Sequence, residues 1–284
     1  MDEINEKHIE KLPRPITINS TECILKQMKN FICRIDLDEK NHGSGFFCKI
    51  QFSKNEVLPV LITCNHIIDD DFLSNNQFLK IFIYQKHINL SLEKIKYYTD
   101  KQYDITILEV KSNEINNFLE LDNDLAIKSN IKEFNDSIYI IHYPSSSFNE
   151  NVVSYGTINI TKDKIKFEHF CSTEDGSSGS PILDITNNKV IGIHTGASTS
   201  FKINYGSFLN ESINNFINEN YSNEMIIQYK LNGEKNIAIF GSSFVDKYRN
   251  NCRIIIEKSE QEIIDIIDVK ELKKKRFLNN KTNI

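Results

Sequence analysis

Several small and hydroxyl-bearing residues gather in one stretch of the chain, residues 172–181, which reads STEDGSSGSP. A serine can hydrolyse an acyl bond when its hydroxyl stands at a sharp turn beside a histidine base. A carboxylate must orient that histidine, and two backbone N–H groups must face the developing oxyanion. Gly176 can turn its N–H inward because it has no Cβ. The spacing predicts Ser178 as the nucleophile and the amides of Gly176 and Ser178 as the oxyanion hole.

The histidine and the carboxylate that such a serine needs lie next to two apolar segments. Residues 61–71 read LITCNHIIDDD, so His66 follows an apolar strand and is expected at its mouth. Asp104 heads the segment DITILEV, and a charged residue beside a buried strand is costly unless it is paired. Three further aspartates at 69–71 follow the histidine in an expected turn and could hardly reach back to its Nδ1. The sequence predicts His66 as the base and Asp104 as its partner.

Each of these residues also has a simpler interpretation. Taken alone, GSSGSP is more often a turn than an active site, and His66 could be an ordinary residue at a strand end. Cys64 is a second candidate nucleophile, but the oxyanion loop carries Ser178, so a buried packing thiol is expected. The histidines at 42, 87, 142 and 169 show no metal-ligand spacing, and no Gly-rich phosphate loop occurs. We therefore expect neither a metal nor a cofactor.

A series of short segments rich in Ile, Val, Phe, Tyr and Thr must position these residues. They span 31–37, 45–52, 57–64, 78–84, 104–110, 137–143, 152–160, 164–170, 180–185 and 189–196. Such segments without long helical patterns between them are typical of an all-β sandwich or barrel. The apolar spacing predicts a helix at 210–220, and residues 5–11 and parts of 22–30 are weaker helix candidates.

In chain order the candidates are His66, Asp104 and Ser178, and at this point the sequence resembles the trypsin-like serine peptidases of the chymotrypsin fold. The similar motifs are GSGFF at 43–47, TCNH at 63–66, YDITILEV at 103–110, DGSSGSPI at 175–182 and VIGIHTG at 190–196. The resemblance implies two antiparallel six-stranded β-barrels with the site in the cleft between them, divided near residues 120–135.

The departures from the animal digestive enzymes are informative. In those enzymes an acid precedes the nucleophile and pairs with a newly cleaved N-terminus, whereas this chain has Ser177 there. Activation by N-terminal cleavage is therefore not expected. The cysteines beside the histidine and near the nucleophile are also missing, since Ile67 and Glu174 stand in their places. The motifs are more similar to bacterial glutamyl endopeptidases and viral trypsin-like proteases.

This closer resemblance implies a substrate preference. In glutamyl endopeptidases a histidine on the later strand and a threonine five residues before the nucleophile bind an acidic P1 side chain. His194 and Thr173 stand at those positions here. A histidine N–H and a threonine hydroxyl can both donate to a carboxylate or amide oxygen. We expect a preference for Glu or Gln at P1.

The segments suggest three parts of the chain: an N-terminal extension at 1–29, a peptidase domain at 30–220 and a small β appendage at 225–284 that ends in a basic tail. The appendage is a possible site for a regulatory partner. The chain has 34 basic and 39 acidic residues, a formal net charge of −5, which does not suggest nucleic acid as a partner. No apolar run is long enough to predict a membrane span, and the six cysteines form no C-x-x-C pair.

Two functions of different classes fit these observations. The first is a cytoplasmic serine endopeptidase that acts on protein or peptide substrates, because the first residues show no signal peptide. The second is a catalytically silent peptide-binding module with the same fold, since such folds also host inactive binders. The complete set of three candidate residues favours the endopeptidase.

Overall fold

The structure of the chain is a computed structural model. It describes residues 12–38, 40–51, 57–111, 113, 115–122, 137–159, 165–198 and 203–221, and the backbone of three strands at 225–231, 234–240 and 262–268. The chain divides into two compact units, Met1–Gln51 with Val57–Phe216, and Phe52–Glu56 with Ile217–Ile284. The predicted division into 1–29, 30–220 and 225–284 stays a prediction, and the expected barrel boundary near 120–135 lies mostly outside the described residues.

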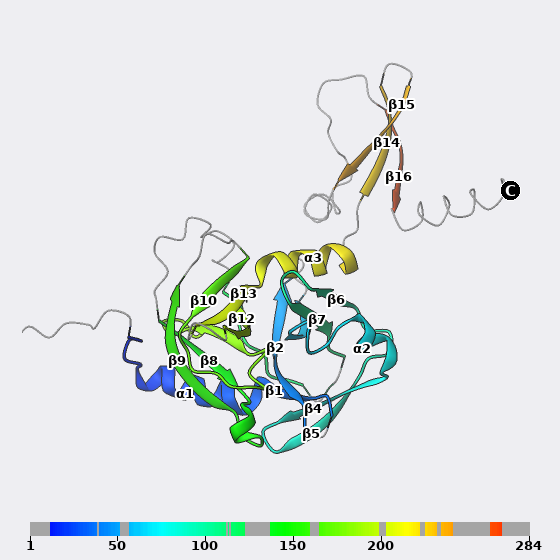
Figure 1. The fold of residues 1–284 in the computed structure, drawn as a ribbon. Helices are drawn as coiled ribbons and strands as arrows, with labels where there is room; N and C mark the ends of the chain where they lie inside the picture. Colours follow the sequence, from blue (N-terminus) through cyan, green and yellow to red (C-terminus); the bar gives the residue numbers. More distant parts are fainter. Residues whose placement is uncertain are drawn as a thin grey trace, which may run out of the picture. The chain divides into compact units, whose positions relative to one another are not determined.

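The first half of the larger unit is an antiparallel sheet in the strand order β5-β4-β1-β2-β3-β7-β6 (Figure 1). Its strands are β1 (Ile32–Asp36), β2 (His42–Gln51), β3 (Val57–Thr63), β4 (Phe78–Ile83), β5 (Lys86–Ser91), β6 (Tyr97–Asp100) and β7 (Ile105–Glu109). The sheet thus has seven strands where six were expected. The register pairs β3 with β7 from Val60 opposite Glu109 to Thr63 opposite Thr106. This pairing brings the residues that follow β3 beside those that precede β7.

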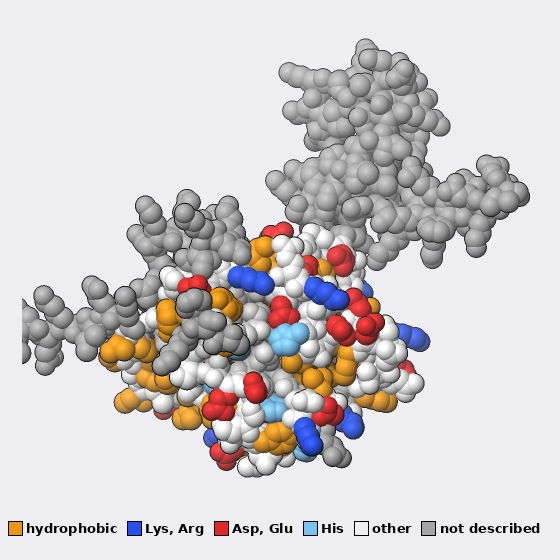
Figure 2. Space-filling view, viewed as in Figure 1, with side chains coloured by type: hydrophobic (Ala, Val, Ile, Leu, Met, Phe, Trp, Pro, Cys, Tyr) orange, Lys and Arg blue, Asp and Glu red, His pale blue; other side chains and the backbone are white. Residues whose placement is uncertain are grey.

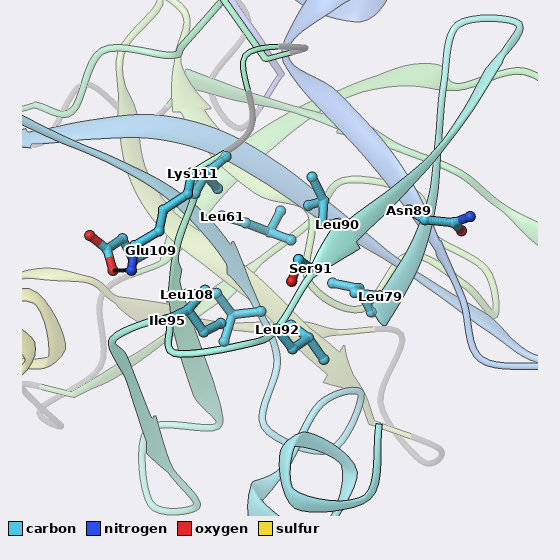
Figure 3. Close-up of a pocket in the computed structure, with 11 residues that line it drawn as sticks. Leu61, Leu79, Asn89, Leu90, Ser91, Leu92, Ile95, Leu108, Glu109 and Lys111 are labelled. Atoms are coloured by element: carbon cyan, nitrogen blue, oxygen red, sulfur yellow. Dashed lines mark ion pairs between the residues drawn. The ribbon is translucent and has the colours of Figure 1, made fainter. Parts of the chain in front are cut away.

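Apolar side chains of this sheet pack into one core. Leu61, Leu79, Leu90 and Leu108 are all at least 90% buried and come from four different strands. They also line a cavity of about 210 Å³, at whose edge Lys111 pairs with Glu109 at 3.2 Å (Figure 3). The candidate site residues do not line this cavity, which belongs to the core.

The second half of the larger unit is a closed barrel in the strand order β10-β13-β12-β11-β8-β9. Its six strands are β8 (Ser137–His142), β9 (Val152–Asn159), β10 (Lys166–His169), β11 (Pro181–Asp184), β12 (Val190–Ala197) and β13 (Asn204–Phe208). Alternate residues point inward, as in β10, where Phe167 and His169 are both fully buried. The all-β, two-barrel architecture expected from the sequence is confirmed.

The described residues also form three α-helices and one 3₁₀ turn. They are α1 (Ile18–Asn30), α2 (Asp70–Asn75), η2 (Ser145–Ser147) and α3 (Asn210–Tyr221). Helix α1 extends the weak candidate at 22–30, because the Thr17 side chain caps it by accepting the Ser20 N–H. The helix predicted at 210–220 is α3, and the candidate at 5–11 lies outside the described residues.

The smaller unit contains a three-stranded antiparallel sheet in the order β15-β14-β16. Its strands are β14 (Met225–Leu231), β15 (Glu234–Phe240) and β16 (Glu262–Asp268), so the predicted β appendage is confirmed as a β structure. The basic tail beyond it lies outside the described residues.

The surface carries charges of both signs (Figure 2), and the described cysteines are free. Acidic and basic side chains are interspersed over the face that Figure 2 shows. The described cysteines are free thiols, of which Cys33, Cys48, Cys64 and Cys171 are buried. Among the described residues, we find no helix with the length and apolar character that crossing a membrane requires.

Candidate active site

His66 stands just beyond the end of β3, where the chain turns away from the sheet. The turn is closed by the carbonyl of Cys64, which accepts the N–H groups of Ile67 and Ile68 at 3.2 and 3.1 Å. The histidine side chain therefore leaves the sheet and is 46% exposed, which leaves it accessible to a substrate.

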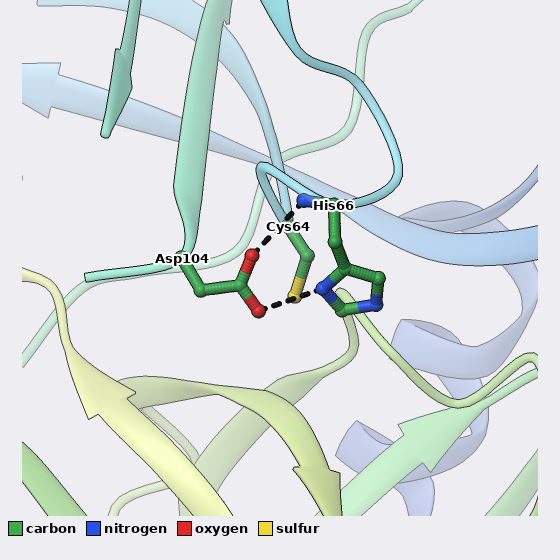
Figure 4. Close-up of side chains that lie close together, drawn as sticks. All are labelled: Cys64, His66 and Asp104. Atoms are coloured by element: carbon green, nitrogen blue, oxygen red, sulfur yellow. Dashed lines mark hydrogen bonds and ion pairs between the residues drawn. The ribbon is translucent and has the colours of Figure 1, made fainter. Parts of the chain in front are cut away.

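Asp104 stands directly before β7 and contacts His66 through both carboxylate oxygens (Figure 4). Oδ1 accepts the backbone N–H of His66 at 3.0 Å, and Oδ2 lies 2.7 Å from Nδ1 of its ring. Asp104 has a φ of 54°, a left-handed conformation that few residues other than glycine adopt. Because a carboxylate only accepts, Nδ1 carries the proton and Nε2 of the neutral ring is left as an acceptor.

The three aspartates at 69–71 have a different role. Asp69 caps helix α2 by accepting the N–H of Phe72 at 2.8 Å, and Asp70 and Asp71 form the first turn of that helix. The carboxylate that contacts His66 is therefore that of Asp104.

The loop that carries Ser178 depends on two glycines with positive φ. Gly176 has a φ of 87° and Gly179 a φ of 90°. A Cβ on Gly176 would lie 2.3 Å from Nε2 of His42, and a Cβ on Gly179 would lie 2.0 Å from the carbonyl oxygen of Ser44. Both the conformation and the close approach of the first sheet therefore require glycine at these positions.

Backbone groups of this loop are arranged by contacts with Ser44 of strand β2. The Ser44 hydroxyl donates to the carbonyl of Gly176 at 2.8 Å, and its N–H donates to the carbonyl of Ser178 at 2.8 Å. The N–H groups of Gly176 and Ser178 donate no hydrogen bond within the described part of the chain. The loop can thus offer two unused donors to a ligand.

Ser178 is half-buried and lies on a loop that contacts the histidine segment. The N–H of Gly179 and the thiol of Cys64 share the carbonyl of His194 as acceptor, at 2.9 and 3.3 Å. No hydrogen bond joins Ser178 to His66 within the described part of the chain. The structure therefore brings His66 and Asp104 into direct contact and places Ser178 on an adjoining loop.

His194 is buried in the second barrel and contacts a second histidine. Its Nδ1 lies 3.0 Å from Nε2 of His169, and the other ring nitrogen of His169 accepts the N–H of Cys171 at 3.4 Å. His169 therefore donates from Nε2 to His194, which leaves the proton of His194 on its own Nε2. Burial lowers the pKa of His169 to about 3, and burial together with His169 lowers the pKa of His194 well below its usual range.

Thr173 is half-buried in the segment before Ser178. It lines a cavity of about 540 Å³ together with His142, Ser154 and Glu174, and His194 is not among the lining residues. The P1 pocket expected from Thr173 and His194 stays a prediction. His169 has no functional signal in the sequence beyond its alternation with Phe167, which places both side chains inside the barrel.

Cys64 lies close enough to His66 and Asp104 to form a possible metal cluster. The ligand atoms of the three residues lie within 4.8 Å of one another (Figure 4). The thiol is fully buried, and burial, followed by the charge of Asp104, raises its pKa well above its usual range. Such a thiol keeps its proton, so it is a poor nucleophile. The predicted role as a packing thiol agrees with these observations.

Comparisons with known proteins agree with this geometry. A family model for the trypsin-like peptidase domain matches residues 43–193. No match was found among curated protein sequences. A similar solved structure is Rv3671c from M. tuberculosis H37Rv, in an inactive form with a serine-to-alanine mutation. Its TM-score is 0.51 at 14% identity, covering 74% of this chain and 96% of that one.

A second similar structure is the serine endoprotease from Yersinia pestis. Its TM-score is 0.52 at 14% identity, covering 75% of this chain and 71% of that one. Rv3671c in its active form gives a TM-score of 0.50 at the same identity, covering 75% and 91%. At this low identity, the likeness to solved structures shows a shared fold.

Proposed function

Because this chain belongs to the trypsin-like peptidase domain family, we propose that it is a serine endopeptidase that uses Ser178, His66 and Asp104. The observation that carries the proposal is the double contact between Asp104 and His66, at 3.0 and 2.7 Å, beside the loop that holds Ser178. This contact fixes the ring in the tautomer that a general base needs.

The reaction follows from the position of each group. His66 Nε2 takes the proton of Ser178 as the serine oxygen attacks the scissile carbonyl, and the imidazolium is stabilised by Asp104. The amides of Gly176 and Ser178 donate to the oxyanion of the tetrahedral intermediate. His66 then gives its proton to the leaving amine, and an acyl group remains on Ser178. A water molecule, deprotonated by His66, releases the acyl group and restores the serine.

The test is covalent labelling by a fluorophosphonate probe. We expect the wild-type protein to be labelled and the Ser178→Ala protein to give no labelling, whereas Ser172→Ala, an exposed serine of the same segment, should label normally. Labelling of the Ser178→Ala protein at the wild-type rate would reject the nucleophile. Failure of the folded wild-type protein to label would instead favour the silent peptide-binding module.

We also propose a preference for Glu or Gln at P1, which rests on His194. Its Nε2 is a neutral donor, so it can hydrogen-bond a side-chain oxygen without adding a charge. This N–H should donate to the amide oxygen of Gln at least as well as to a carboxylate oxygen of Glu. Thr173, which lines a cavity with His142 and Glu174, is the second expected donor of this pocket. Cleavage of a peptide library mainly after Lys, Arg or large apolar residues would show that this preference is wrong.

The cytoplasmic location and a regulatory partner at residues 225–284 stay predictions. Removing residues 225–284 and finding both activity and bound partners unaltered would count against such a partner.

A further inference from the structure

The peptide bond between Asp175 and Gly176 is held from one side by a single residue. The carbonyl oxygen of Asp175 accepts two hydrogen bonds from Ser145, one from its N–H and one from its hydroxyl, each 2.9 Å long. Ser145 is the first residue of the turn η2 (Ser145–Ser147) in the second barrel. Two donors from one residue therefore fix the direction of this carbonyl.

The direction of the Asp175 carbonyl decides the direction of the Gly176 N–H. A trans peptide is planar, and its N–H and C=O groups point in opposite directions. No peptide bond in the described residues is cis. With the carbonyl toward Ser145, the N–H of Gly176 points away from Ser145. A rotation of this peptide would turn the carbonyl inward and remove an oxyanion donor.

The segment that carries Ser145 is fastened to the first sheet. Arg34 of β1 is buried, stacks 3.6 Å from the ring of Phe148 and donates to the Phe148 carbonyl at 2.5 Å. Asp36 holds the other side of the guanidinium at 2.5 Å. At the start of the segment, the Tyr143 carbonyl is bonded by Nε2 of His42 at 3.0 Å. Both ends of residues 143–148 are thus tied to the sheet that supplies His66 and Asp104.

A second contact holds the same loop from within the barrel. The hydroxyl of Ser177 accepts the N–H of Glu174 at 3.1 Å and lies 2.7 Å from Nδ1 of His142. Within the described residues the Ser177 hydroxyl has no other acceptor, so its O–H donates to that nitrogen. Ser177 is fully buried, and this contact occupies the position where the digestive enzymes carry an acid. The loop is therefore held without an ion pair.

We propose that Ser145 is a positioning residue, which holds the Asp175–Gly176 peptide with its N–H directed at the reaction centre in the absence of any N-terminal cleavage. The inference rests on the proposed endopeptidase function. Ser145 acts through Asp175 and Gly176 and contacts no reacting atom, so its loss should slow the chemical step and leave the binding of the probe unchanged.

Two substitutions remove the donors one at a time. Ser145→Ala removes the hydroxyl and keeps the N–H, whereas Ser145→Pro removes both. Proline is tolerated at the first position of a helical turn. A proline also requires an extended residue before it, and Pro144 is already extended, with φ −76° and ψ 155°. Ser145→Thr keeps both donors. Ser147→Ala is a matched control, because its side chain makes no hydrogen bond within the described residues.

The experiment measures the maximal rate and the half-saturating concentration of fluorophosphonate inactivation for each protein. We expect the maximal rate to fall about fivefold for Ser145→Ala and further for Ser145→Pro, since one exposed hydrogen bond contributes roughly such a factor. Ser145→Thr and Ser147→Ala should behave as wild type, and the half-saturating concentration should stay constant. Thermal denaturation of each variant verifies that it is folded.

The outcomes separate the two proposals. A Ser145→Pro protein that is folded and inactivated at the wild-type rate would overturn the role of Ser145 and leave the endopeptidase proposal standing. An equal fall in the maximal rate for Ser145→Thr and Ser145→Ala would also overturn the role of Ser145. So would a slower inactivation that comes only from weaker probe binding. A wild-type protein that the probe does not label would reject the endopeptidase itself.

Discussion

The two halves of the larger unit contribute to the candidate site in different ways. The seven-stranded sheet supplies His66 and Asp104, which are joined by hydrogen bonds to side-chain atoms. The closed barrel supplies a loop in which two glycines have positive φ and carbonyl groups are held by hydrogen bonds. The first half thus depends on the chemical type of its side chains, and the second depends on the conformation of its backbone. Substitutions in the two halves should therefore fail for different reasons.

The largest effect is expected from Asp104→Asn in the first half. The amide would favour the wrong tautomer of His66, and a change of this kind lowers kcat by about 10⁴-fold in a Ser-His-Asp enzyme. We expect the protein to keep its thermal stability within a few degrees, so rate and stability should separate. The measurement is the rate of fluorophosphonate labelling beside a thermal denaturation curve.

Asp69→Asn is the matched control for this change. Asp69 caps helix α2 and makes no contact with His66. Asparagine caps helices about as well as aspartate, so both activity and stability should be preserved. Equal labelling of the Asp104→Asn and wild-type proteins would contradict the role of Asp104 and remove the contrast between the halves.

The next effect is expected from Gly179→Ala in the second half. A Cβ there would lie 2.0 Å from the Ser44 carbonyl and 2.5 Å from the Thr63 hydroxyl, at a φ of 90°. Backbone strain of about 1–3 kcal/mol adds to a steric cost of similar size. We expect both activity and stability to fall together, as measured by probe labelling and chemical denaturation.

Gly196→Ala separates strain from crowding. Gly196 also has a positive φ, 157°, but a Cβ there would meet no atom within 4 Å. Its substitution should cost only the strain of about 1–3 kcal/mol. If the Gly179→Ala protein were as stable as the Gly196→Ala protein, the loop would not approach the first sheet as closely as the structure indicates.

The smallest effect is expected from pH, through histidines of the second barrel. Burial lowers the pKa of His142 to about 4, from an ordinary value near 6.5. Below about pH 6.5 His142 binds a proton in the unfolded chain, whereas in the folded chain it binds one only near pH 4. The contribution of such a histidine to the free energy of unfolding is therefore fully present above pH 6.5. It falls by about 1.4 kcal/mol per pH unit between pH 6.5 and pH 4.

His142→Asn tests this dependence. The asparagine oxygen can replace Nδ1 as acceptor for Ser177, and it does not titrate in this range. We expect the variant to lose less stability than wild type between pH 7 and pH 5 in denaturant titrations. His87→Asn, at a side chain 70% exposed, should leave the dependence unchanged. Equal slopes for His142→Asn and wild type would contradict the assignment.

The sequence predicted best where one residue type has one physical use. Short apolar segments predicted ten of the thirteen described strands of the larger unit, and the spacing of Ile213, Phe216 and Ile217 predicted helix α3. Residues 69–71 were set aside because they follow His66 in a turn and could hardly reach back to its Nδ1, and Asp104 is the carboxylate in contact with His66. Strands β5, β6 and β13 were not predicted, because they are short and contain few apolar residues.

The sequence alone determined the types of the reacting groups, since a serine between glycines, a histidine after a strand and an aspartate before one each restrict the chemistry that is possible. Tertiary structure decided how those groups are held. Ser145, Arg34 and His169 are ordinary residues in the sequence, and their contacts with Asp175, Phe148 and His194 join segments 30, 114 and 25 residues apart. Such partners are decided by how the chain folds within the second barrel and, for Arg34, between the two halves, because a side chain's hydrogen bonds depend on which distant segment lies beside it. No local pattern of residue types records that choice.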